Sequence, residues 1–286
     1  MKESVADNQT QKIKQGFGTF FFYAGLVALS LTCIYPLIWL LMNSMKTDTE
    51  LFNNPWWFGS GFEISNYSTA WTAGKIGRSF VNSAFVAISS VGITIIASSM
   101  AAFGFTRLKW KLSTPILSLI LLGVMIPIHS TLIPLFTIFS KLGITNRYLA
   151  LILPYVAFAL PTSIFILSGF MSTFPKEIEE AVIIDGCSMA GVFWKIVFPL
   201  SKTPIATISI YNFVSMWNEL MFALILLQDQ SKTTLPVSLT RFKGQYSTNW
   251  TIQLAAVVIM VIPSIMAYMF LNDKIIESMT IGAVKG

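Results

Sequence analysis

The chain has 286 residues, of which 54% are apolar and only 11% are charged, whereas about 25% charged residues is usual for a soluble domain. This composition excludes an ordinary water-soluble fold. The formal net charge is +6, but a mean hydropathy of +0.68 and 23 phenylalanines argue against nucleic-acid binding, so the basic residues are better explained by membrane topology.

Six long windows that are almost free of charge follow one another along the chain. A helix needs about 20 mostly apolar residues to cross the hydrocarbon core of a bilayer, and each window is long enough. Glu219 is the one charged residue inside them. The pattern predicts an all-α polytopic membrane protein with six transmembrane helices, in the windows 17–43, 79–106, 112–140, 148–175, 203–228 and 244–272.

These windows divide the chain into a polar N-terminal tail (1–16), a transmembrane domain (17–272) and a C-terminal tail (273–286). The first window lacks a small-residue cleavage site, so we expect it to be retained as a span. An even number of spans places both termini on one side of the membrane. The short link that holds Arg107, Lys109 and Lys111 is expected to stay cytoplasmic, which makes both termini cytoplasmic.

The sequence contains no motif that predicts catalysis. A phosphate-binding loop that ends in Gly-Lys-Ser/Thr is missing, as are the Gly-x-Ser-x-Gly and His-Glu-x-x-His patterns. The single histidine, His129, has no neighbour at metal-ligand spacing. We therefore expect no enzyme activity, no ATPase motif, no catalytic residue, no metal site and no cofactor bound by this chain.

The segment of about 173–202 stands out because five charges fall between residues 176 and 185. Pro175 suits the first turn of a helix, and the glutamates that follow favour its positive end. The pattern predicts one short helix over 176–185, ended by Gly186, and a second that starts near Ser188 and stops at Pro199. The apolar residues of the second helix form one stripe: Met189, Val192, Phe193, Ile196 and Val197. On these grounds alone, a surface cap on the bundle and a functional loop remain equally open.

The same segment resembles the "EAA loop" of permease subunits from ABC importers. Glu180, Ala181, Asp185 and Gly186, followed after nine residues by Ile196 to Pro199, match its pattern in order and spacing. Val182 stands where a second alanine is usual, and Phe198 where leucine is usual. Further segments are similar to carbohydrate-importer permeases of the maltose and oligosaccharide type: 43–48, 82–83, 126–127, 131–134, 217–219 and 282–286.

This resemblance implies that the chain is one of two permease subunits in a sugar or oligosaccharide importer of a bacterial-type inner membrane. Its partners would be a second permease subunit, two cytoplasmic ATPase subunits that use ATP and Mg, and an extracellular or periplasmic sugar-binding protein. It also implies that the helix over 176–185 docks on the ATPase, with Glu180 and Asp185 as polar contacts, Ala181 for close approach and Gly186 for the turn. The C-terminal residues would reach the ATPase, although a dispensable tail is the alternative: Gly282, Ala283, Val284, Lys285 and Gly286.

Glu219 is a functional candidate because an ionisable residue inside a bilayer is costly unless it faces water or a partner. With Trp217 and Asn218, it could line a sugar pathway or hold helices together, and both roles stay open. A second class of function is an ion-coupled secondary transporter that uses Glu219. That mechanism lacks a second intramembrane carboxylate and an inverted repeat.

Overall fold

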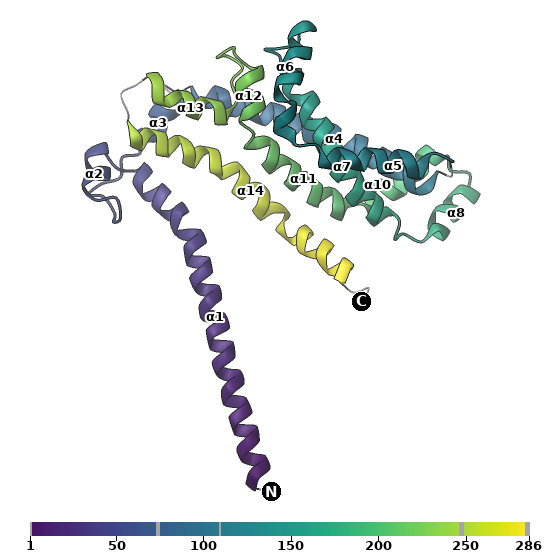
Figure 1. Ribbon diagram of the computed structural model, residues 1–286, viewed down its shortest axis with the longest axis horizontal. Helices are drawn as coiled ribbons and strands as arrows, with labels where there is room; N and C mark the ends of the chain where they lie inside the picture. The colour runs from purple at the N-terminus through teal and green to yellow at the C-terminus, as the bar shows by residue number, and fades with distance from the viewer. Residues whose placement is uncertain (1, 73–74, 109, 246–248, 284–286) are drawn as a thin grey trace. The chain divides into compact units, whose positions relative to one another are not determined.

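The computed structural model describes residues 2–72, 75–108, 110–245 and 249–283 (Figure 1). Within these ranges the regular elements are all helices, so the predicted all-α class is confirmed. The longer helices are α1 (Lys2–Ser44), α4 (Ile76–Arg107), α7 (Leu149–Met171), α11 (Lys202–Trp217) and α14 (Trp250–Ala283). The shorter ones outside the 173–202 segment are α2 (Asp48–Asn53), α3 (Ser65–Thr72), α5 (Ser113–Leu122), α6 (Leu132–Lys141), α12 (Met221–Leu226) and α13 (Leu235–Gln245).

The chain divides into two compact units. The first comprises residues 1–70 and 248–258, and the second comprises 71–247 and 259–286. In the first unit, α1 carries an apolar stretch, Thr19–Ser44, whose residues 19–38 are exposed. Asp48 accepts hydrogen bonds from the backbone N–H and the hydroxyl of Thr251, both at 2.9 Å, which satisfies donors at the start of α14.

The second unit is built around α4, α7 and α11, which pack against one another (Figure 1). Small side chains let α4 and α7 approach closely, and Ser90, Ser98, Ala102 and Ala150 are all fully buried. A hydrogen bond of 3.0 Å from the Asn212 amide to the Ser163 hydroxyl ties α11 to α7. This packed group positions both candidate sites described below.

Among the residues that the structure describes, four helices are long and apolar enough to span a membrane: Thr19–Ser44, Ile76–Arg107, Leu149–Met171 and Trp250–Phe270. They correspond to the first, second, fourth and sixth predicted windows. The third window is broken, because Ser113–Met125 and Ile128–Lys141 meet at an angle of 91°. Pro127 explains the break, since a residue before proline is pushed out of the helical region and Ile126 is extended at φ −76° and ψ 118°.

The fifth predicted window is also divided, because α11 ends at Trp217 and α12 begins only at Met221. Neither piece is long enough to count as a span. The described residues therefore provide four spanning helices, or five if the bent pair counts as one, and the predicted number of six continuous spans is not confirmed.

Candidate functional site

The segment 173–202 forms a helix, a tight turn and a second helical stretch. The helix α8 (Lys176–Ile184) starts after Pro175, and Asp185 is its C-cap residue. Gly186 follows with φ +86°. The N–H of Cys187 bonds to the Val182 carbonyl at 3.1 Å and the N–H of Gly186 to the Ile183 carbonyl at 2.9 Å. This is the Schellman arrangement, in which a glycine in the left-handed region closes the helix end.

The second stretch is longer than the sequence predicts. The Ser188 hydroxyl accepts the N–H of Gly191 at 3.2 Å and caps α9 (Met189–Val192). The stretch continues through a short π-helix, η3 (Phe193–Val197), and then α10 (Phe198–Leu200). The sequence predicts that this helix stops at Pro199, but the helix continues to Leu200. Pro199 lies in the first turn of α10, where a missing N–H costs no bond. The stretch ends at Ser201, whose hydroxyl donates to the Val197 carbonyl at 2.7 Å.

One face of this segment is packed into the second unit. Val192, Phe193 and Val197, three residues of the predicted stripe, are buried, whereas Met189 is exposed and Ile196 is half-buried. The buried residues lie in one apolar cluster with residues of α4, α7 and α11: Ala102, Phe103, Leu167, Met171 and Ile208. Val182 of α8 packs against the same cluster. The segment is therefore packed against α4, α7 and α11.

The opposite face of α8 is free. Glu180, Ala181, Asp185 and Gly186 are all exposed. Ile184 is 85% exposed, a large value for an isoleucine next to a packed core. The structure thus brings the predicted coupling residues of α8 together on one outward surface, while Ile196 and Pro199 lie in the anchoring stretch.

Glu219 lies in the break between α11 and α12. Its carboxylate accepts the N–H of Phe222 at 2.8 Å and the N–H of Ala223 at 3.2 Å. The Tyr155 hydroxyl donates to the same carboxylate at 2.6 Å. Glu219 therefore satisfies free donors at the start of α12. Sequence reasoning missed this role because it treated the window 203–228 as one continuous helix, although the polar pair Asn218 and Glu219 lies at the break.

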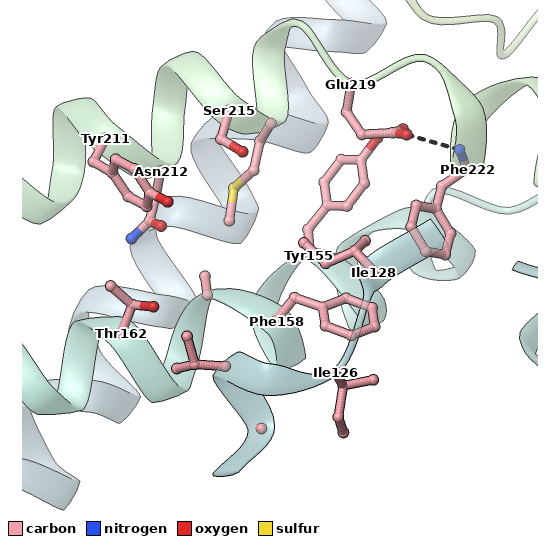
Figure 2. A pocket seen from close by; sticks show the side chains of 14 residues that line it. Ile126, Ile128, Tyr155, Phe158, Thr162, Tyr211, Asn212, Ser215, Glu219 and Phe222 are labelled. Atoms are coloured by element: carbon pink, nitrogen blue, oxygen red, sulfur yellow. Dashed lines mark hydrogen bonds between the residues drawn. The ribbon is translucent and has the colours of Figure 1, made fainter. Parts of the chain in front are cut away.

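The Glu219 carboxylate also borders a cavity of about 220 Å³. Figure 2 shows Glu219 with Tyr155 and Phe222 at one end, and Tyr211, Asn212 and Thr162 toward the other. The wall mixes hydroxyls, an amide and a carboxylate with aromatic and aliphatic side chains. The lining residues are Gly123, Val124, Ile126, Ile128, Tyr155, Phe158, Ala159, Thr162, Tyr211, Asn212, Ser215, Met216, Glu219 and Phe222. Such a wall suits a neutral, hydroxylated ligand.

Trp217 and Asn218 lie outside this wall. The Trp217 side chain is buried, and its indole N–H donates to the Met260 carbonyl at 2.9 Å. Its ring packs between Phe213 and Phe80, with centroids 5.6 and 5.2 Å away. The exposed Asn218 donates to the Val214 carbonyl at 2.8 Å. The Trp217 ring is thus stacked on Phe213 and buried among the chain's own side chains.

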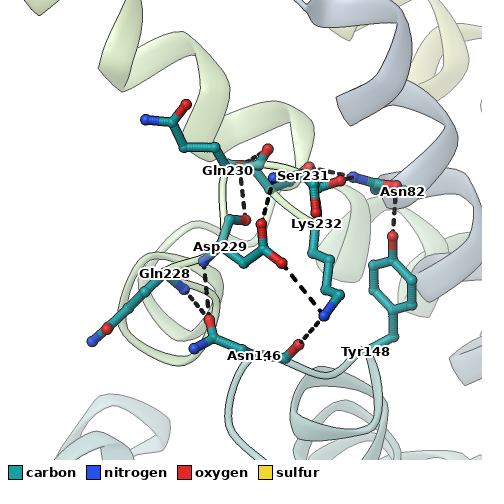
Figure 3. Close-up of polar contacts among 9 residues, drawn as sticks. Asn82, Asn146, Tyr148, Gln228, Asp229, Gln230, Ser231 and Lys232 are labelled. Carbon is teal, nitrogen blue, oxygen red and sulfur yellow. Dashed lines mark hydrogen bonds and ion pairs between the residues drawn. The ribbon is translucent and has the colours of Figure 1, made fainter.

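A polar network joins the start of α4 to the segments around residues 146 and 230 (Figure 3). The buried Asn82 amide donates to the carbonyls of Ser231 and Thr233 at 3.1 and 2.9 Å, and the Tyr148 hydroxyl donates to its oxygen at 2.8 Å. Hydrogen bonds from Ser231 lower the pKa of Asp229. These bonds hold the segment around residue 146 and the segment around residue 230 against the start of α4.

The C-terminal candidates are only partly described. Gly282 and Ala283 are the last residues of α14, whereas Val284, Lys285 and Gly286 lie outside the described residues. Across the described side chains, no group of three or more histidine, cysteine, aspartate or glutamate residues could hold a metal ion.

Comparison with protein families gives a match over residues 93–280 to the binding-protein-dependent transport system inner membrane component. The chain belongs to this family. It is thus a transport component, the permease subunit of an ABC importer, as the resemblance implied. Partners of such a permease are a second permease, ATPase subunits and an external binding protein. The comparisons do not support the alternative of an ion-coupled secondary transporter.

Three relatives cover nearly the whole permease. A putative ABC transporter permease, ORF2 of Caldicellulosiruptor sp., is 40% identical over 93% of this chain and 96% of its own length. The melibiose/raffinose/stachyose import permease MelC of Bacillus subtilis is 33% identical over 91% and 95%. The sulfoquinovosyl glycerol transport system permease SmoH of Agrobacterium fabrum is 34% identical over 88% and 89%.

The fold also matches a solved structure. A chain of a bacterial ABC transporter involved in the import of the acidic polysaccharide alginate superposes with a TM-score of 0.78. It covers 87% of this chain and 92% of its own length at 20% identity. At that identity the match supports the fold of the permease and not its substrate.

Proposed function

We propose that the permease forms one half of a membrane pathway for a sugar or an oligosaccharide. Transport through this pathway is driven by ATP hydrolysis on a separate ATPase subunit, which binds the ATP and Mg. Support for the substrate class comes from relatives whose names specify sugar import, such as melibiose, raffinose and stachyose. The sequence carries no phosphate-binding loop of its own, which fits a permease that depends on another subunit for energy.

The two-faced helix α8 is the observation that carries this proposal. We infer that it docks on the ATPase through the exposed Glu180, Ala181 and Asp185, with Gly186 setting the turn. Val192, Phe193 and Val197 anchor the segment in the apolar cluster. Burial of such a side chain is worth about 1.5–3 kcal/mol, so a push on α8 is passed to α4 and α7 rather than absorbed by a loose loop.

We further infer that the cavity beside Glu219 lies on the sugar pathway. Its wall offers hydroxyls from Tyr155, Thr162 and Ser215 and the amide of Asn212, groups that pair with sugar hydroxyls. Trp217 is assigned to helix packing, because both its ring and its N–H are engaged within the chain. Asn218, exposed beside them, is assigned no ligand contact.

The proposed topology places both termini and the 173–202 segment in the cytoplasm, with the transmembrane domain over 17–272 between the tails 1–16 and 273–286. Arg107 and Lys111 support it, because positive charge in short links stays inside. In this arrangement the tail 282–286 is on the ATPase side and contributes to that contact.

Reconstitution tests the proposed function. The tagged permease is purified from its native membranes with the subunits that accompany it and placed in vesicles. Uptake of ¹⁴C-labelled raffinose, diacetylchitobiose and arabinotriose is then measured with the binding protein outside and ATP and Mg inside. We expect uptake of at least one sugar that depends on ATP. Uptake driven by a proton or sodium gradient without ATP would contradict the proposal.

A further inference from the structure

A buried ion pair connects α8 to the end of α4. The Nε atom of Arg107, the last residue of α4, lies 2.6 Å from the Oε1 atom of Glu179. The two side chains are only 4% and 9% exposed. Glu177 and Glu180, the neighbouring carboxylates of α8, are exposed. The helix therefore turns one of three glutamates inward, toward a single arginine from a distant part of the sequence.

The same guanidinium also holds the end of α7. Its Nη2 atom donates to the Met171 carbonyl at 2.7 Å and to the Phe174 carbonyl at 3.3 Å. Met171 is the last residue of α7, where carbonyls lack partners within the helix and the helix dipole favours a positive charge. Arg107 thus joins the ends of α4 and α7 to the first turn of α8.

Stability alone is a weak reason to keep this pair. Burying two charges costs desolvation energy that their attraction often only balances, and an apolar pair of similar size is frequently as stable. An apolar pair would fit at this position, because Phe103, Met171 and Val182 already belong to one apolar cluster. What the guanidinium adds is a second point of contact, because its Nη2 atom bonds to the end of α7 while its Nε atom lies against the Glu179 carboxylate, and an apolar side chain does neither.

We propose that Arg107 and Glu179 are positioning residues that transmit the movement of α8 to α4 and α7. This inference rests on the proposed docking of α8 on the ATPase. The exposed face of α8 receives the push, and the inward-facing Glu179 passes it to Arg107. Helix α7 carries Tyr155, whose hydroxyl holds Glu219 at the cavity wall. A displacement of α8 is thereby linked to the shape of the cavity.

Neutralising Glu179 tests this link, with Glu63→Gln as the matched control, because Glu63 is an exposed glutamate outside the 173–202 segment. Each variant is expressed in the native host, purified with its accompanying subunits and reconstituted. The readouts are the amount of assembled complex, basal ATP hydrolysis, and the labelled sugar taken up per ATP hydrolysed, with raffinose, diacetylchitobiose and arabinotriose as probes. The last ratio separates positioning from a purely structural role.

We expect Glu179→Gln to lower sugar uptake per ATP by about fivefold or more, while basal hydrolysis and the Glu63→Gln control stay at the wild-type level. Arg107→Lys retains the charge but cannot reach both the carboxylate and the α7 carbonyls, so its ratio falls to an intermediate value. This second variant decides the matter if Glu179→Gln does not assemble.

An unchanged ratio in the assembled variants would overturn the proposal, even if less complex were recovered, because it would show a structural role only. Failure of the wild-type assembly to take up any of the three sugars with ATP is a different result. That outcome would contradict the proposed function itself, and the role of the ion pair in coupling would fall with it.

Discussion

Replacing Gly186 with alanine tests whether the turn after α8 sets the geometry of the coupling segment. Gly186 has φ +86°, and a Cβ atom added there would meet nothing within 4 Å. The cost of alanine is therefore backbone strain alone, about 1–2 kcal/mol for an L-residue in the left-handed region. This is small beside the roughly 5–15 kcal/mol that keeps a domain folded, so we expect the variant to fold and to insert.

A strain of that size lowers the preference for the native turn over alternative turns by a factor of about 5–30. We therefore expect Gly186→Ala to reduce ATP-driven uptake of labelled sugar in vesicles, by up to that factor, with assembly unchanged. Gly186→Asn should stay closer to wild type because asparagine tolerates the left-handed region. Gly186→Asp adds a charge to the exposed docking face and should uncouple hydrolysis from uptake while leaving insertion intact.

Gly143 supplies the matched control. It has φ +67° and an equally open Cβ position, but it lies at the end of α6, outside the coupling segment. Gly143→Ala carries the same kind of strain and should leave uptake per ATP unchanged. The reasoning is refuted if Gly186→Ala transports at the wild-type rate, or if both alanine variants lose uptake to the same extent.

Three further predictions concern stability. Asn82→Ala removes three hydrogen bonds, one buried and two part-buried, so SDS unfolding in mixed micelles should show a loss of about 2–3 kcal/mol. Tyr148→Phe removes one of them and should lose about 1 kcal/mol; equal losses would argue against the network. Glu219→Gln keeps an acceptor for α12 and should lose only about 1 kcal/mol while retaining ATP-driven uptake; complete loss of uptake would contradict this, because it would show that the charge itself is required. Hydrogen bonds from the side chain and backbone of Ser60, and then from Thr47, lower the pKa of Glu50 from its ordinary value of 4.5. The folded state therefore disfavours protonation, and the contribution of Glu50 is present above that value and lost as the pH falls through the lowered one. Hydrogen exchange in the 45–64 peptide should rise on acidification relative to Glu50→Gln, and identical pH profiles for the two proteins would contradict this assignment.

The sequence was informative where charge or a special backbone residue marks a boundary. Four of the predicted windows correspond to long helices, and the ends of α8 follow from Pro175 and Gly186 to within a residue. The breaks in the third and fifth windows were not predicted, although polar residues or a proline lie at both. Pro127 carried a signal for the first break, and Asn218 and Glu219 lie in the second.

The individual site residues were harder to predict. Helical periodicity separates Glu179 from Glu180 by 100° of rotation, but only the position of Arg107 decides which of them is buried. The distant Phe80 and Met260 likewise supply the contacts that support the packing role proposed for Trp217. Such assignments depend on contacts between residues far apart in the chain, which a single sequence does not specify.

The docking of α8 on an ATPase is the central claim, and Ile184 offers the most direct test because its side chain is 85% exposed on that helix. A photo-crosslinking benzoylphenylalanine is placed at residue 184 in the native assembly, with position 165, an exposed phenylalanine of α7, as the control. Mass spectrometry identifies the crosslinked partner. We predict the ATPase subunit at 184 and not at 165. A crosslink from 184 to lipid or to the external binding protein would contradict the account.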